Sequence, residues 1–185
     1  MKRSLVFLSL AAAFALPPSQ AEAGDVYCPP SRGAVTIGAN VVVIGSCTLD
    51  GTRVRGNVIV ERRGSLLARR ADIDGNVQTD GAQRVRLLRT DVDGSVQLEG
   101  LISSLPSVVN RSEIEGSIQV KQNRSPLALL NNFVDEDVQA FTNRGGVRIE
   151  LNVIGGNLQC KENSPRPTGY GNRVGGNKED QCRGL

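Results

Sequence analysis

A short motif recurs along the chain with a period of about 20 residues. Its clearest copy is Ile73-Asp74-Gly75-Asn76-Val77-Gln78. In this copy a β-branched residue lies two positions before the glycine, and Asn, an aliphatic residue and Gln follow the glycine. The glycine position falls at residues 39, 56, 75, 94, 116, 136, 156 and 176, with spacings of 17, 19, 19, 22, 20, 20 and 20 residues. A repeat of this length is the signature of a solenoid, in which each copy forms one coil of a stack.

Apolar and polar residues alternate around each glycine position, which is typical of a strand with one inward face. The residue two positions earlier is always β-branched, as at Ile73, Val92 and Ile114, and the residue two positions later is aliphatic in all copies but the last. We therefore predict an all-β, single-domain parallel β-helix of about eight coils of 17–22 residues. The uneven coil lengths favour the right-handed form. We expect the glycine at a corner with an unusual backbone angle and the Asn and Gln positions on the outside.

The four cysteines lie near the two ends of the repeat region. Cys28 and Cys47 are 19 residues apart, and Cys160 and Cys182 are 22 apart, close to one period in each case. Residues one period apart lie on adjacent rungs, about 4.8 Å away, which is near the roughly 5.5 Å between the Cα atoms of a disulfide. We predict that these two pairs staple the ends. Free thiols, or another of the three possible connectivities, are the alternatives.

The N-terminus has the pattern of a secretory signal peptide. A basic start is followed by a short apolar run and by Ala21-Glu22-Ala23, and the run is shorter than the roughly 20 residues of a membrane-spanning helix. We predict a signal peptide at 1–23, an N-terminal cap at 24–38, the β-helix repeats at 39–160, and a C-terminal coil and cap at 161–185. The mature chain is then exported to the periplasm or beyond the cell, with no membrane span.

Composition argues against several classes of function. The chain has no His, which excludes Ser-His-Asp and Cys-His catalysis, and it has no Walker or Gly-x-Gly-x-x-Gly loop. A formal net charge of +3 is too small to favour nucleic acid, and with 3% aromatic residues and no Trp a sugar-stacking platform is not expected. We predict no catalysis, no cofactor and no confident metal site.

The most regular candidate binding feature is a row of amides, one in each of five consecutive coils: Gln78, Gln97, Gln119, Gln139 and Gln159. Stacked amides can hydrogen-bond to one another along the rod, as in other in-register β stacks. Alternatively, the row forms a flat polar face that docks a repeating ligand such as a glycan.

Charged residues form further rows. Acidic residues occur at Asp74, Asp93, Glu115 and Asp135 and at Asp72, Asp91 and Glu113, beside a basic row of Arg70, Arg89 and Arg111. We expect the rows to compensate each other in a surface salt-bridge network, with a cation or polyanion site as the alternative. Asp135, Glu136 and Asp137 form a weak candidate cation corner, and a solvated corner is the alternative. An apolar insertion around 99–106 either covers the rod or offers a contact patch.

The repeat and its ending, from Gly156-Asn157-Leu158-Gln159-Cys160 to Gly176-Asn177 and Cys182, resemble secreted bacterial β-helix repeat proteins of unassigned function. The repeat style is also similar to that of bactofilins, which are cytoskeletal polymers without the signal peptide and cysteines. The resemblance implies a β-helix and supplies no catalytic residues. We expect an exported structural or binding protein that presents polar ladders. Its partner would be a cell-envelope glycan or protein, or a second copy. The alternative is a carbohydrate-binding module or a polysaccharide-processing enzyme.

Overall fold

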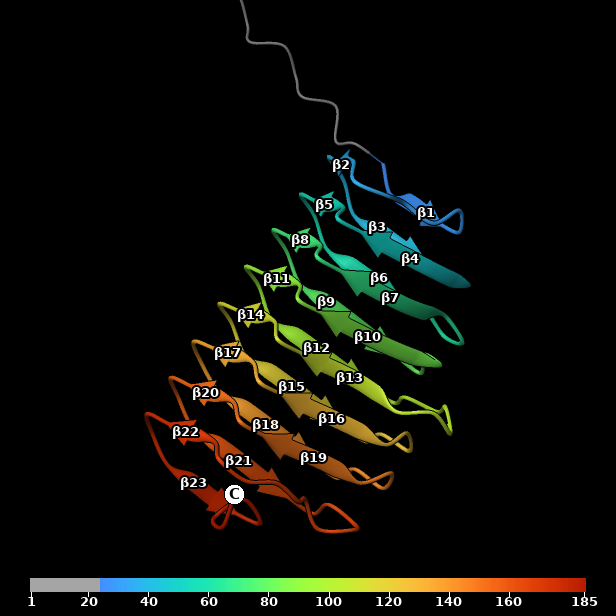
Figure 1. Ribbon diagram of the computed structural model, residues 1–185. Coiled ribbons are helices and arrows are strands. Elements are labelled where there is room, and N and C mark those ends of the chain that lie inside the picture. The colour runs from blue at the N-terminus through green and yellow to red at the C-terminus, as the bar shows by residue number, and fades with distance from the viewer. Residues whose placement is uncertain (1–23) are drawn as a thin grey trace, which may run out of the picture.

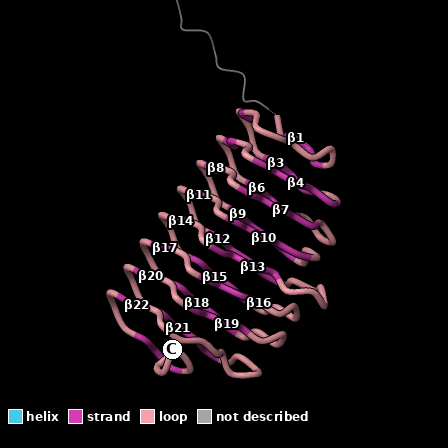
Figure 2. Tube along the Cα trace, viewed as in Figure 1, coloured by secondary structure: helices cyan, strands magenta, loops and turns pink. Residues whose placement is uncertain are grey.

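The chain winds into a stack of rungs whose strands form three parallel sheets (Figure 1). The computed structural model describes residues 24–185, and the predicted signal peptide lies outside the described residues. Each inner rung gives one strand to each sheet in turn, whereas the rungs at the two ends lack a sheet B strand, and residues 24–185 contain no helix (Figure 2). The prediction of an all-β parallel β-helix is confirmed, with about seven turns. In this part of the chain no helix is available that could cross a bilayer.

The three sheets run the length of the rod. Sheet A consists of β1 (Val26–Cys28), β3 (Val41–Val43), β6 (Val58–Val60), β9 (Val77–Asp80), β12 (Val96–Glu99), β15 (Ile118–Lys121), β18 (Val138–Phe141), β21 (Leu158–Lys161) and β23 (Lys178–Asp180). Sheet B consists of β4 (Ser46–Asp50), β7 (Ser65–Arg69), β10 (Arg84–Leu88), β13 (Ser107–Asn110), β16 (Leu127–Leu130) and β19 (Val147–Glu150). Sheet C consists of β2 (Thr36–Ile37), β5 (Arg53–Val54), β8 (Asp72–Ile73), β11 (Asp91–Val92), β14 (Glu113–Ile114), β17 (Phe133–Val134), β20 (Val153–Ile154) and β22 (Arg173–Val174).

The core consists of aliphatic rows that run along the rod. In sheet A, Val77 pairs in register with Val96, which pairs with Ile118, and all three are fully buried. Sheet C stacks Ile73, Val92 and Ile114 in the same way. Each such side chain contributes about 1.5–3 kcal/mol on burial. A single rung could not bury this face alone, so the fold depends on stacking.

The corner before sheet C has a left-handed backbone, and arginine rather than glycine occupies it in three successive rungs. The φ angles in this corner row lie between 48° and 70°, at Gly51, Arg70, Arg89, Arg111, Asn131, Leu151 and Gly171. A second left-handed corner follows sheet A, at Gly81, Gly100, Gln122, Thr142 and Glu162. The prediction that the repeat glycine supplies the unusual angle is therefore wrong.

Close stacking explains the repeat glycine instead. A Cβ on Gly75 would lie 2.7 Å from Asn57 Oδ1 and 2.8 Å from the Gly56 carbonyl carbon of the preceding rung. Where Asn follows the glycine in the inner rungs, its side chain accepts a backbone N–H from the next rung, as Asn57 Oδ1 does from Asn76 at 2.8 Å. Most of these Asn side chains are half-buried and bonded within the stack, and Asn177 at the end of the row is exposed. The outward Gln positions are described below.

Buried asparagines line both corners in the C-terminal half of the rod. One ladder runs through Asn132, Asn152 and Asn172, and the other through Asn123, Asn143 and Asn163. In the first ladder, Asn152 Oδ1 accepts from the backbone and the side chain of Asn132 at 3.0 and 2.9 Å. The residue after each left-handed corner points inward. Its side-chain amide forms hydrogen bonds with backbone N–H and C=O groups that have no strand partner at the bend.

The predicted disulfides are confirmed. Cys28 and Cys47 join with 5.6 Å between their Cα atoms, and Cys160 and Cys182 join with 5.2 Å. Each pair ties a terminal rung to its neighbour. The insertion around 99–106 is mixed: Leu101 is buried in the core, whereas Ile102 and Leu105 are exposed.

Candidate functional site

The outer face of sheet A carries one unbroken row of side chains in register. The row comprises Tyr27, Val42, Ile59, Gln78, Gln97, Gln119, Gln139, Gln159 and Glu179. Alternation along each strand turns these residues away from the core. All five glutamines of the predicted amide row are therefore brought into line, and the row begins with an exposed aromatic ring and two aliphatic side chains.

The amides form two separate hydrogen-bonded segments. Gln78 Nε2 donates to Gln97 Oε1 at 3.2 Å. Gln139 donates to Gln159 at 3.0 Å, and Gln159 donates to Glu179 at 2.9 Å. Between them, Gln119 Oε1 accepts instead from Lys121 Nζ at 3.0 Å. The face thus combines an internal ladder with amide atoms that are available to a partner.

Two shallow grooves adjoin the N-terminal end of this face. One, of about 440 Å³, includes Tyr27, Ile44 and Ile59, and the other, of about 290 Å³, includes Gln78 and Asp80; Glu61 and Arg62 line both. The sequence interpretation missed this group. Glu61 and Asp80 occupy the same repeat position in consecutive rungs, and that spacing could have revealed them.

The acidic rows lie on the outer face of sheet C. Asp72, Asp91 and Glu113 pair in register as the first residues of their strands. Among residues 24–185 the ion pairs to these rows come from Arg53, which contacts Asp72 at 2.9 Å and Asp74 at 3.0 Å. Burial raises the pKa of Asp91 above its ordinary value, and the charges of Glu113, Asp72 and Asp93 raise it further. The acidic rows are therefore largely uncompensated within the molecule.

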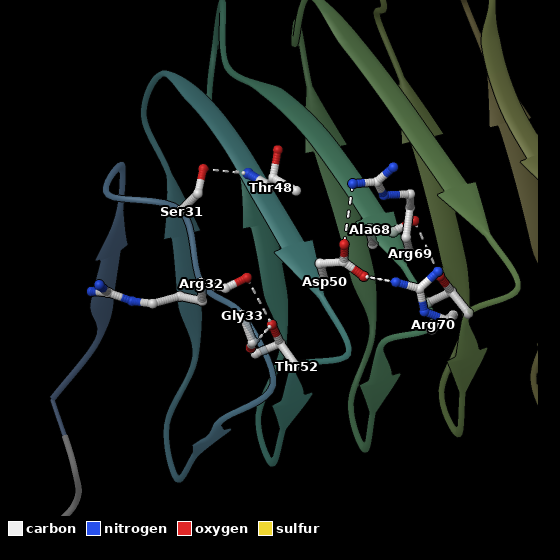
Figure 3. Close-up of polar contacts among 10 residues, drawn as sticks. Ser31, Arg32, Gly33, Thr48, Asp50, Thr52, Ala68, Arg69 and Arg70 are labelled. Carbon is white, nitrogen blue, oxygen red and sulfur yellow. Dashed lines mark hydrogen bonds and ion pairs between the residues drawn. The ribbon is translucent and has the colours of Figure 1, made fainter.

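The basic row lies in the left-handed corner two residues before the acidic row. Arg70, together with Arg69, binds Asp50 of the preceding rung on the sheet B side (Figure 3). Within the described part of the chain, no carboxylate lies within 4.0 Å of Arg89 or Arg111. The predicted compensation between the basic and acidic rows is wrong, because the acidic rows pair with Arg53 and Arg70 pairs with Asp50 instead.

The candidate cation corner uses its carboxylates within the fold. Asp137 Oδ1 accepts from the Asn157 backbone N–H at 2.6 Å. Glu136 Oε2 accepts from the Ser117 hydroxyl at 2.9 Å, and Asp135 points outward. Residues 24–185 contain no group of three metal-ligating side chains placed to hold an ion. The cation corner stays a prediction.

A further groove of about 420 Å³ lies on the outer face of sheet B. Its lining includes the outward residues Val108, Ala128 and Leu130, with Arg148 and Arg166 also among the lining residues. In the sequence, this groove corresponds to apolar residues at three outward strand positions. These positions can be recognised as outward only when the register of the strands is known.

Comparison with protein-family models, with curated proteins and with solved structures finds no match for this chain.

Proposed function

We propose that the protein is an exported, non-catalytic binding rod that holds an extended cell-envelope glycan along the outer face of sheet A. The two disulfides fit a non-reducing environment, in agreement with the predicted export. Export through a signal peptide at 1–23 is part of the proposal.

The observation that carries the proposal is the in-register row from Tyr27 to Glu179. Successive side chains repeat at about 4.8 Å on a rigid sheet, so donors and acceptors recur along a straight line. An extended polymer with a regular series of hydroxyl groups can meet such a row at many points. The ring of Tyr27, which is 56% exposed, offers one apolar surface for a sugar ring at the end of the row.

The test is retention of the exported protein on insoluble envelope polysaccharides. Joint replacement of Gln97 and Gln119 by Ala should weaken retention, because both residues face outward in the middle of the row. Gln83→Ala is the matched control, since Gln83 precedes sheet B and lies outside the row. Equal retention of the wild type and both variants, or no retention of any of them, would refute glycan binding at this face.

A second candidate function is polysaccharide processing at the same end. Glu61 and Asp80 line one groove together with Arg62, and glycan-cleaving enzymes use paired carboxylates. The assay is release of reducing sugar or unsaturated product from acidic glycans. Activity that disappears in a Glu61→Gln, Asp80→Asn double variant would replace the non-catalytic proposal, whereas the absence of product would leave the binding function in place.

A further inference from the structure

The acidic face and the basic corner form two parallel stripes of opposite charge. The sheet C stripe consists of Arg53, Asp72, Asp91, Glu113, Phe133, Val153 and Arg173. The corner stripe consists of Gly51, Arg70, Arg89, Arg111, Asn131, Leu151 and Gly171. One buried residue separates the two stripes in every rung, so both run along the same edge of the rod.

We infer that this edge binds the same edge of a second copy, about a two-fold axis parallel to the rod. Such an axis places each rung opposite the same rung of the second copy and exchanges the two stripes. The sheet C stripe of one copy then lies against the corner stripe of the other. An axis perpendicular to the rod within the contact plane would instead place acid against acid.

The residues match rung by rung in this arrangement. In three consecutive rungs the carboxylates of Asp72, Asp91 and Glu113 face the arginines of the corner stripe. Where the sheet C stripe carries arginine instead, at Arg53 and Arg173, the corner stripe has glycine. The contact therefore brings no like charges together at either end.

The contact also covers apolar side chains that a single copy leaves exposed. Val153 of one copy meets Leu151 of the other, and Phe133 lies one rung away. Their exposed fractions are 37%, 46% and 59%. A second copy that brings apolar groups to these rungs explains why the sheet C stripe carries exposed aliphatic and aromatic residues there.

The basic corner favours a partner over an internal role. Arginine holds a left-handed φ in three successive rungs, although glycine adopts this angle without cost and occupies the row at both ends. Arg89 and Arg111 gain no ion pair within residues 24–185 in return. Carboxylates from a second copy would supply one for each of them.

The contact is narrow, on the order of 400 Å² per copy or about 800 Å² in total, which is smaller than a standard specific interface and fits a weak, transient one. We therefore expect a weak dimer that is favoured at low ionic strength and dissociates as salt screens the exposed charges. Because the contact is isologous and uses a single edge, the assembly closes at two copies.

Analytical ultracentrifugation of the purified exported protein over a concentration series tests this arrangement. Wild-type dimerisation should strengthen at low salt. Arg89→Asp and Asp91→Arg should each weaken it at least about tenfold, because each reversal makes two contacts repulsive across the axis. The double variant Arg89→Asp, Asp91→Arg should dimerise again, since the exchanged charges still face each other. A mixture of the two single variants should form heterodimers. Far-UV circular dichroism of every variant confirms that the fold is retained.

Leu151→Ser provides an independent measurement, because it removes apolar contact and leaves the charges unchanged. It should weaken dimerisation without altering its dependence on salt. A wild type that stays monomeric at all concentrations and salt levels overturns the inference, as does failure of the double variant to recover. Glycan retention is measured on a different face, so its failure would leave this result unaffected.

Discussion

Replacing Asn152 by alanine removes one step of a buried asparagine ladder. The side chain donates to the Leu129 carbonyl and to Asn172 Oδ1, both at 2.9 Å. It also accepts from the backbone and the side chain of Asn132. The Asn132 backbone N–H would lose this acceptor in a site closed to water, which costs about 1–3 kcal/mol, and each other lost bond costs about 0.5–1.5 kcal/mol. We expect the free energy of unfolding to fall by about 3–5 kcal/mol.

Urea unfolding followed by far-UV circular dichroism measures this change, because the chain has no Trp to serve as a fluorescent probe. Asn177→Ala is the matched control. Asn177 is exposed at the end of its row, and its bond to Asn157 uses the backbone N–H, which alanine retains. The control should change stability by less than about 0.5 kcal/mol. If the Asn152 variant lost no more than the control, the ladder would not stabilise the corner and the reasoning would be refuted.

Three further predictions concern the stack, the staple and the charged face. Gly75→Ala should lower the free energy of unfolding by about 2–3 kcal/mol, because the added Cβ would lie 2.7 Å from an atom of the preceding rung. Gly38→Ala is the control and should be nearly neutral, since its Cβ would meet no atom within 4 Å. Thermal unfolding compares the two variants. Joint replacement of Cys160 and Cys182 by Ala should lower the free energy of unfolding by about 3 kcal/mol. A variant as stable in urea as the wild type would contradict a stabilising role for this disulfide. The folded state raises the pKa of Asp91, so the ionised carboxylate destabilises the fold above that pKa and the penalty fades as pH falls through it. Asp91→Asn should therefore stabilise dilute protein at neutral pH, and this gain should disappear in acid.

The inward half of the architecture could be predicted from the sequence. β-branched residues recur two positions before each glycine, and strands pair in register because a slip of one residue would expose that whole row. The cysteine pairs followed from the same period, since residues one repeat apart stack on adjacent rungs. These features depend only on spacing and burial, which a repeated sequence displays directly.

The corners could not be predicted in the same way. Arg89 has no local sequence signal for a left-handed backbone, and only stacking onto the neighbouring rungs imposes that angle. The direction of its side chain then decides whether it meets Asp91, so the pairing of the charged rows could not be read from adjacency in the sequence. Asn152 carries no sign of burial in the sequence, and its inward position became evident only in the folded stack.

The two asparagine ladders occupy only the later rungs. At the equivalent corner the earlier rungs carry Thr52, Ala71, Thr90 and Ser112, which are buried but make fewer cross-rung bonds than the asparagines. In a one-dimensional array, stability is the sum of local terms and nearest-neighbour terms, so cohesion between rungs should rise toward the C-terminus. Amide hydrogen exchange should therefore be slowest in the later rungs. Synthesis begins at the other end, so the most cohesive segment is completed last. During synthesis the less cohesive rungs are therefore completed first, and the rungs with the most cross-rung amide bonds are completed last.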